Sequence, residues 1–144
     1  MIYKKTKNKY FVRLVKGENI FVSLHNLCKK ENINSAWIKG IGAIENITIG
    51  SYNLKKKRYD KKILNGVFEL VSLIGNFSFK EGEPFLHLHV TVSDYECKAF
   101  GGHLFTADIN ATGEFIIESL DIDADRIYDD NIGLHLLEFN HCEG

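Results

Sequence analysis

The sequence predicts an α+β fold in which a mostly antiparallel β-sheet carries one or two helices packed on it. Three observations lead to this prediction. The chain has 144 residues, of which 44% are hydrophobic, which suits one domain with a substantial core. Several segments alternate between apolar and polar residues, as strands half buried in a sheet do. One segment instead has the spacing of an amphipathic helix. We therefore expect residues 1–144 to form a single domain.

The N-terminal part of the chain predicts a strand followed by the helix. Residues 10–15 alternate around Arg13, and Gly17 ends this strand. Asn19 is a suitable N-cap, because its side chain accepts a hydrogen bond from a backbone N–H of the first helical turn. The helix should end near Lys30, and its apolar residues recur on one face: Ile20, Phe21, Leu24, Leu27 and Cys28.

The remainder of the chain predicts strands joined by turns. Residues 35–38 are a short strand, and Gly40-Ile41-Gly42 is expected to be a turn, as is Asn65-Gly66. Gly75 is expected at a bulge or at a close approach of two backbones. The acidic segment 121–131 is expected to be a loop. Further strands are predicted at 44–52, 68–79, 85–93, 99–109, 114–120 and 133–139.

Charge is distributed unevenly along the chain, although the formal net charge is only −1. Residues 1–72 contain 15 basic and 5 acidic side chains, whereas residues 73–144 contain 3 and 14. We expect strands from both halves to mix in one sheet, so this bias does not by itself predict a basic face for DNA. Six of the basic residues cluster at 55–62, where we expect a solvated turn.

The cysteines and the hydropathy pattern indicate a cytoplasmic protein. Cys28, Cys97 and Cys142 are far apart and odd in number, so neither a disulfide framework nor a thiolate zinc site is expected. Every apolar run is shorter than the roughly 20 residues that a membrane helix needs, so we expect no membrane partner. The lysine-rich N-terminus is not followed by the apolar stretch of a signal peptide, so secretion is not expected.

The strand predicted at 85–93 carries the residues with the clearest chemistry. Its alternation directs one set of side chains to the core: Leu86, Leu88, Val90 and Val92. The other set faces away from the core: Phe85, His87, His89 and Thr91. Because a strand rises ~3.4 Å per residue, the Cβ atoms of the two histidines should lie about 7 Å apart on one face.

A third histidine, His103, follows after a short reversal at 94–98. With the turn near residues 95–96, residues whose numbers sum to about 191 should face each other across the two strands. His103 would then lie opposite position 88, between the other two histidines. Gly101 and Gly102 remove side chains next to it, which lets backbone or a ligand approach closely.

Three neutral imidazoles with one open position are typical of a zinc site that keeps a water or a ligand. Nickel, iron and copper also suit imidazole, and the ligand set alone does not choose among them. We expect His87, His89 and His103 to bind one divalent metal, with zinc as the first choice. The competing interpretation is three solvated histidines near a hairpin. The other histidines are expected to be surface, core-edge or tail residues: His25, His135 and His141.

Five motifs occur in the chain in a fixed order. They are Arg13-Leu14 before Gly17-Glu18, Gly40-Ile41-Gly42-Ala43, the segment from Phe68 to Gly75, His87-x-His89, and Gly101-Gly102-His103-Leu104. In these motifs, over about residues 13–120, the chain resembles the prokaryotic stand-alone type of PPC domain (plants and prokaryotes conserved). The resemblance implies a sheet-and-helix fold and a homotrimer. It also implies a metal, often zinc, at the three histidines.

Two functions from different classes remain open. The first is a metal-binding homotrimer with a binding or regulatory role and a small molecule as its partner at the metal. DNA is a further partner that the family's usual label implies, but the charge gives no support and the Arg-Gly-Arg-Pro AT-hook of plant relatives is absent. The second is a zinc-dependent enzyme that uses a metal-bound water on a small substrate. Its acid or base would be Glu69, Glu114 or Glu118, but no spacing places them near the histidines, so catalytic residues stay unassigned.

Overall fold

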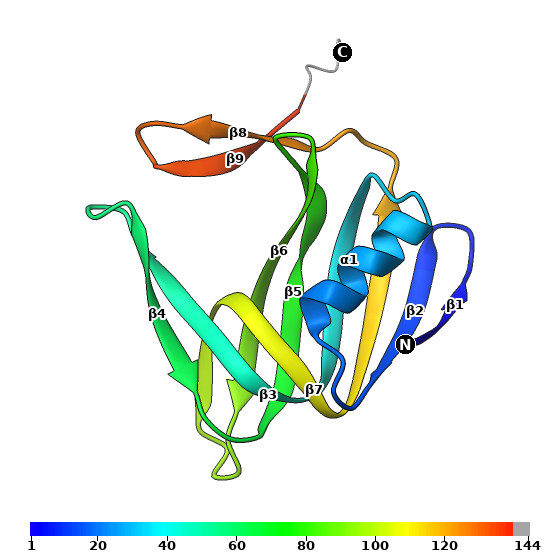
Figure 1. Cartoon of the computed structure of the whole chain (residues 1–144), viewed down its shortest axis with the longest axis vertical. Coiled ribbons are helices and arrows are strands. Elements are labelled where there is room, and N and C mark those ends of the chain that lie inside the picture. Colours follow the sequence, from blue (N-terminus) through cyan, green and yellow to red (C-terminus); the bar gives the residue numbers. More distant parts are fainter. Residues whose placement is uncertain (140–144) are drawn as a thin grey trace.

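This computed structural model describes residues 1–139, which contain one helix and nine strands (Figure 1). They are β1 (Ile2–Lys5), β2 (Lys9–Val15), α1 (Ile20–Lys30), β3 (Ser35–Asn53), β4 (Arg58–Leu64), β5 (Phe68–Lys80), β6 (Glu83–Ser93), β7 (Ala99–Leu120), β8 (Asp125–Asp129) and β9 (Leu134–Glu138). Seven strands form one antiparallel sheet in the order β1-β2-β7-β6-β5-β3-β4, and β8 and β9 form a separate hairpin. The predicted α+β fold is confirmed.

Two strands are longer than the sequence predicted, and in β3 the glycines that were expected to form a turn instead allow close packing. Gly40 and Gly42 lie inside β3, where the register shifts, and not in a turn. A Cβ at Gly40 would lie 2.2 Å from Cδ1 of Phe115, so only glycine fits there. Gly42 is paired with Gly113 of β7. The strands predicted at 99–109 and 114–120 are likewise one strand, β7.

The long strands curl the sheet into a ring. β7 pairs with β6 and also with β3, so the strands β3, β5, β6 and β7 close on one another. Figure 1 shows that β3 and β7 bend strongly along their length. Strands from the basic first half and the acidic second half therefore lie next to each other, as β2 and β7 do. The residues predicted to face the core from β6 are all buried: Leu86, Leu88, Val90 and Val92.

The helix α1 closes one side of the core, and its bounds are those that the sequence predicts. The side chain of Asn19 caps it by accepting a hydrogen bond from the backbone N–H of Val22, at 3.2 Å. The apolar face is completely buried at Ile20, Leu24, Leu27 and Cys28. The spacing of the apolar residues and the capping asparagine are local features of the sequence, which is why the pattern identified the helix.

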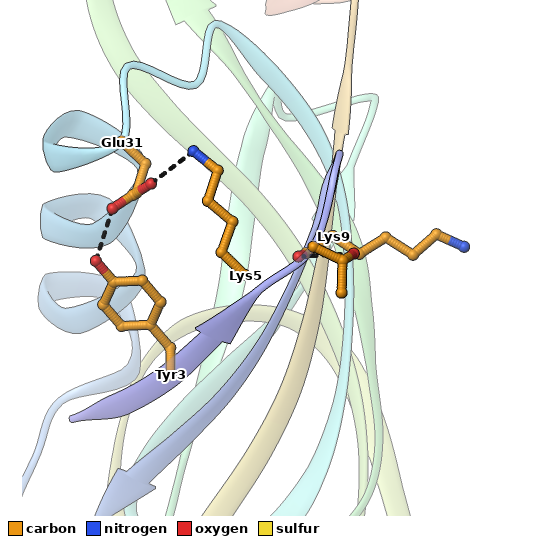
Figure 2. A network of polar contacts seen from close by, with 5 residues as sticks. Tyr3, Lys5, Lys9 and Glu31 are labelled. Carbon is orange, nitrogen blue, oxygen red and sulfur yellow. Dashed lines mark hydrogen bonds and ion pairs between the residues drawn. The ribbon is translucent and has the colours of Figure 1, made fainter.

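The strand β1 was not predicted, because it is only four residues long and lysine-rich. It pairs with β2 and is attached to the end of α1 through Glu31. Figure 2 shows Tyr3 and Lys5 reaching this carboxylate from the same strand. The hydroxyl of Tyr3 donates to Glu31 at 2.6 Å, and Nζ of Lys5 donates at 3.0 Å.

The β8–β9 hairpin lies beyond the ends of β5 and β6 (Figure 1). The segment 121–131 was predicted to be a loop, but it contains β8, which pairs with β9. The hairpin is joined to the main sheet by long-range contacts that no local pattern reveals. The backbone N–H of Phe79 donates to the carbonyl of Ala124 at 2.9 Å, and the hydroxyl of Tyr52 donates to the carbonyl of Ile132 at 2.7 Å.

Within residues 1–139, no helix is both long enough and apolar enough to cross a membrane.

Candidate metal centre

The three histidines identified in the sequence lie together where β6 meets β7. His87 and His89 are on β6, and His89 is directly paired with His103 of β7. The Nε2 atoms of His87 and His89 are 3.2 Å apart. The ring centroids of the three pairs are 5.1, 5.2 and 5.4 Å apart. One ring nitrogen from each residue lies within 4.8 Å of the other two, so the structure brings all three predicted residues together.

The predicted pairing of His103 was wrong by one residue. His103 lies opposite His89, not opposite position 88, because the reversal is centred on Glu96. The backbone N–H of Asp94 donates to the carbonyl of Lys98, and the N–H of Cys97 donates to the carbonyl of Asp94. Cys97 has a φ of 61° there. The shift improves the site, because directly paired residues of two antiparallel strands point to the same face.

Close backbone packing supports the histidines from behind. Gly75 of β5 faces β6, and a Cβ on it would lie 2.0 Å from the carbonyl oxygen of His87. The prediction of a close backbone approach at Gly75 is confirmed. On the other side of the site, the ring of His103 packs against Tyr59 and Phe105, with centroids 4.8 and 4.7 Å away.

Burial keeps two of the imidazoles neutral. It is the largest cause that lowers the pKa of His87 to about 4, followed by the charges of Arg126 and His89. Burial also lowers the pKa of His103 to about 4, with further contributions from the other two histidines, Lys61 and Arg126. A neutral imidazole is the form that binds a metal, so near pH 7 these two side chains need to lose no proton first.

The geometry fits a small divalent cation. In a tetrahedral zinc site with Zn–N distances of ~2.0–2.1 Å, ligand nitrogens are about 3.3 Å apart. The Nε2 atoms of His87 and His89 are at 3.2 Å. Nδ1 of His103 is buried and has no hydrogen-bond partner within the described part of the chain. A buried nitrogen without a partner costs free energy, so His103 gains from an added cation or ligand.

A cleft of about 390 Å³ opens beside two of the histidines, His87 and His103. Its other polar residues are Tyr59, Lys80, Arg126 and His135. Its walls are mainly apolar: Phe21, Phe85, Leu104, Phe105, Leu134 and Leu136. None of the residues of 1–139 that line it is an aspartate or a glutamate. A small molecule in this cleft would lie next to the candidate metal.

Arg126 is a site residue that the sequence analysis missed. It comes from β8 and is only 8% exposed. Its Nε donates to Oγ of Ser78 at 3.0 Å, and Nη2 donates to Oδ1 of Asn76 at 2.9 Å. Nη2 also lies 3.4 Å from Nδ1 of His87. No local signal could have placed Arg126 here, because 39 residues separate it from His87.

The other residues considered from the sequence lie elsewhere. His25 is half buried on α1, and Nε2 of His135 is 3.0 Å from Oε1 of Glu81. Cys97 is exposed in the turn after β6. Glu118 forms an ion pair with Lys9 at 3.3 Å. Glu114 lies opposite Arg13 where β7 pairs with β2, and Glu69 lies opposite Ser93 where β5 pairs with β6. His141 and Cys142 lie outside the described residues.

Comparison with known proteins agrees with the motifs. The Plants and Prokaryotes Conserved (PCC) domain matches residues 1–121. A candidate DNA-binding protein from Bacteroides thetaiotaomicron has 38% identity and a TM-score of 0.91, with 96% of each chain covered. A plant- and prokaryote-conserved (PPC) protein from Pyrococcus horikoshii has 37% identity and a TM-score of 0.85, with 98% of this chain and 97% of that chain covered.

A third solved structure bears on the metal. It is a metal-containing protein from Archaeoglobus fulgidus, with 31% identity, a TM-score of 0.84, and coverage of 96% of this chain and 99% of that chain. A search of curated proteins finds no match. The family motifs, the fold and the histidine cluster agree with one another. The chain belongs to the plants and prokaryotes conserved (PPC, or PCC) domain family.

Proposed function

We propose that this protein is a zinc-binding module that holds a small molecule beside the metal and has a binding or regulatory role. The observation that carries the proposal is the convergence of His87, His89 and His103, two of which, His87 and His103, line a cleft. The three histidines would hold the metal and leave one position open. The metal-containing relative from Archaeoglobus fulgidus supports this assignment. When bound, zinc supplies a strong positive charge that attracts an oxygen atom of a ligand.

Elemental analysis of untagged protein tests the proposal. We expect one zinc per chain after purification, or after incubation with zinc and removal of the excess. His89→Ala should lose the metal, whereas His25→Ala on α1 should keep it. Protein that takes up no zinc under these conditions would return the three histidines to the interpretation of solvated side chains.

We also propose that three copies of the chain associate through the exposed face of the sheet over β2, β3 and β7. Phe11, Ile41 and Ile116 line a groove on this face, and the first two are 60% and 55% exposed. Ile74 pairs with Lys39 two residues from Ile41, so it lies on the same face and is 46% exposed. An apolar patch of this kind marks an interaction surface. The homotrimer implied by the family resemblance would cover it.

Sedimentation equilibrium tests the assembly. The expected mass is three times the 16.4 kDa of one chain. Ile41→Lys should shift the distribution toward monomer, because a charge would be buried in the interface. Val22→Lys is the matched control, since Val22 is 58% exposed on α1 and lies away from the groove. A monomeric wild-type protein would overturn the proposed trimer.

We also propose that the protein associates with DNA, because two relatives are described as candidate DNA-binding proteins. A gel-shift assay at two salt concentrations tests it, because phosphate contacts weaken steeply as salt rises. Binding at low salt that fades at high salt would support a role on DNA. Absence of a shift at about 50 mM salt, where electrostatic binding is strong, would exclude it.

A zinc-dependent enzyme is the second candidate, favoured by the cleft that adjoins the histidines. No carboxylate lines the cleft within residues 1–139, so an enzyme would have to use His135, Lys80 or Tyr59 as its acid or base. Metal-loaded protein assayed against a panel of hydrolase and lyase substrates separates the two. Turnover that is lost in His89→Ala would favour the enzyme.

A further inference from the structure

Within the described residues 1–139, Arg126 is a buried charge without a counter-ion. Its side chain is 8% exposed, and no carboxylate of residues 1–139 lies within 4.0 Å of its guanidinium. Burial lowers the pKa of Arg126, but a guanidinium stays charged at any physiological pH. A buried charge is expensive unless it is paired, so an anion is the missing partner.

We propose that the cleft binds a small organic carboxylate, with the carboxylate held between Arg126 and the metal and the apolar part of the molecule against the aromatic wall. This inference rests on the proposed metal site. It goes beyond the family match, because that match ends at residue 121 and Arg126 comes from the hairpin that follows.

Some N–H groups of the Arg126 guanidinium are not used in hydrogen bonds of normal length within the described part of the chain. The guanidinium has five, of which Nε–H bonds Ser78, one on Nη2 bonds Asn76, and one on Nη1 bonds the carbonyl of His135 at 3.3 Å. The remaining Nη1 hydrogen has no acceptor in the part of the chain that the structure describes. The remaining Nη2 hydrogen faces Nδ1 of His87 across a long 3.4 Å contact.

Metal binding would release that last N–H. A metal on Nε2 of His87 requires the proton of the neutral ring to sit on Nδ1, as in other histidine metal sites. Nδ1 then donates and cannot accept from Arg126. The guanidinium would have two unused N–H groups beside the cleft, and a carboxylate accepts two such hydrogen bonds in the bidentate arrangement that arginine favours.

The surrounding charges also favour an anion. Nζ of Lys80 and Cζ of Arg126 lie 5.8 and 5.1 Å from the ring centroid of Phe85, so two cations flank one aromatic residue of the wall. A divalent metal on neutral histidines would add further positive charge. Glu81 is the carboxylate bonded to His135 at the rim, but its side chain is 73% exposed.

The shape and lining of the cleft favour an organic molecule over inorganic phosphate. Its volume of about 390 Å³ falls within the ~300–1,000 Å³ that is usual for small-molecule sites. Its walls include Phe21, Phe85 and Phe105, which offer apolar contact. Phosphate sites, in contrast, gather several N–H donors around one group, often at a helix N-terminus. A single arginine in an apolar cleft suits a planar carboxylate with a hydrocarbon body.

Isothermal titration of zinc-loaded full-length protein tests the inference with glycolate, lactate and mandelate, each compared with its neutral amide. We expect the acids to bind in the order mandelate, lactate, glycolate, because apolar contact increases in that direction. Mandelate should bind at least about 10-fold more tightly than mandelamide, which carries no charge to pair with Arg126. Zinc content is measured on every sample before titration.

Variants separate the role of the arginine from general effects on folding. Arg126→Lys keeps the charge but loses the planar pair of N–H groups, so mandelate should bind at least about 10-fold more weakly while zinc content and circular dichroism are unchanged. Lys56→Ala, on the exposed turn before β4, is the control and should bind like wild type. If Arg126→Lys does not fold, the acid and amide comparison on wild-type protein still decides the question.

The outcomes distinguish the two proposals. Zinc binding with tighter binding of the acids than of the amides supports the inference. Zinc binding with no preference for the acids, or with a preference that Arg126→Lys leaves unchanged, overturns the inference and leaves the metal site standing. Protein that binds no zinc overturns both.

Discussion

Glu31 joins β1 to the end of α1, and Arg126 joins the β8–β9 hairpin to the main sheet, but their charges are balanced in opposite ways. Glu31, just after α1, accepts hydrogen bonds from Tyr3 and from Lys5, as Figure 2 shows. The hydrogen bond from Tyr3, followed by that from Lys5, lowers the pKa of Glu31. Among residues 1–139, Arg126 is buried beside His87 with neutral partners only, and burial lowers its pKa.

The difference indicates which cluster is structural and which is functional. The contacts of Glu31 are complete within the fold, so they attach β1 to the helix and need nothing more. The contacts around Arg126 and the histidines are incomplete, because a buried charge lacks a counter-ion and Nδ1 of His103 lacks a partner within residues 1–139. Buried polar groups without partners are rare in native folds, and a bound ion or ligand is one explanation for them. Four experiments test this contrast.

Removal of one histidine should have the largest effect. His89→Ala takes away one of the three proposed ligands and should weaken zinc binding by at least about 100-fold, more than the 10–100-fold usual for loss of an outer contact. Competition with a chromophoric chelator measures the affinity. Glu31→Gln, in the completed cluster, should leave it unchanged. Equal losses in both variants would contradict the contrast.

Acid should destabilise the metal-free protein through the histidines. Because the pKa values of His87 and His103 are about 4 in the fold, against 6.5 in the unfolded chain, the unfolded state binds protons first. Their contribution is present above pH 6.5 and is lost as the pH falls toward 4, by at most about 1.4 kcal/mol per pH unit for each histidine. Urea unfolding at stepped pH measures this slope. The double variant His87→Ala and His103→Phe should lose it.

Gly75→Ala should strain the support behind the histidines. The new Cβ would lie 2.0 Å from the carbonyl oxygen of His87, and overpacking of this kind costs about 1–3 kcal/mol. Both the urea midpoint and the zinc affinity should fall. Gly101→Ala is the milder control, because its nearest atom would be the carbonyl oxygen of Val90 at 3.1 Å. A larger loss at Gly101 than at Gly75 would contradict the packing argument.

Loss of the Glu31 carboxylate should have the smallest effect. Glu31→Gln removes the charged acceptor of the hydrogen bonds from Tyr3 and Lys5. Because the Lys5 side chain is 50% exposed, its ion pair with Glu31 is worth little. Because the pKa of Glu31 is lowered in the fold, its contribution is present at neutral pH and is lost as the pH falls below the usual range of a glutamate. Thermal unfolding should show a small decrease at pH 7 that disappears in acid. If the variant and the wild type differ in melting temperature by the same amount at both pH values, the stabilising role of the Glu31 carboxylate is contradicted.

Local patterns predicted the helix and most strands, but not where the longest strands end. The turn predicted at 40–42 includes Gly40, because glycine is common in turns, and Gly113 lies between the strands predicted at 99–109 and 114–120. In the fold both glycines lie inside β3 and β7, where the ring of Phe115 occupies the space of a side chain. That role of glycine depends on a neighbour far away in sequence, so no window along the chain contains it.

The sequence alone determined that His87 and His89 share a face, because the two-residue repeat of a strand holds whatever the strand pairs with. It also determined the helix and its cap, because the apolar spacing and the capping asparagine can be recognised within one short segment. Only the tertiary structure decided that His103 faces His89 and that Arg126 reaches their cleft. Both depend on chain reversals whose register is set by packing and by turn geometry, and a shift of one residue there reverses the face of every side chain that follows.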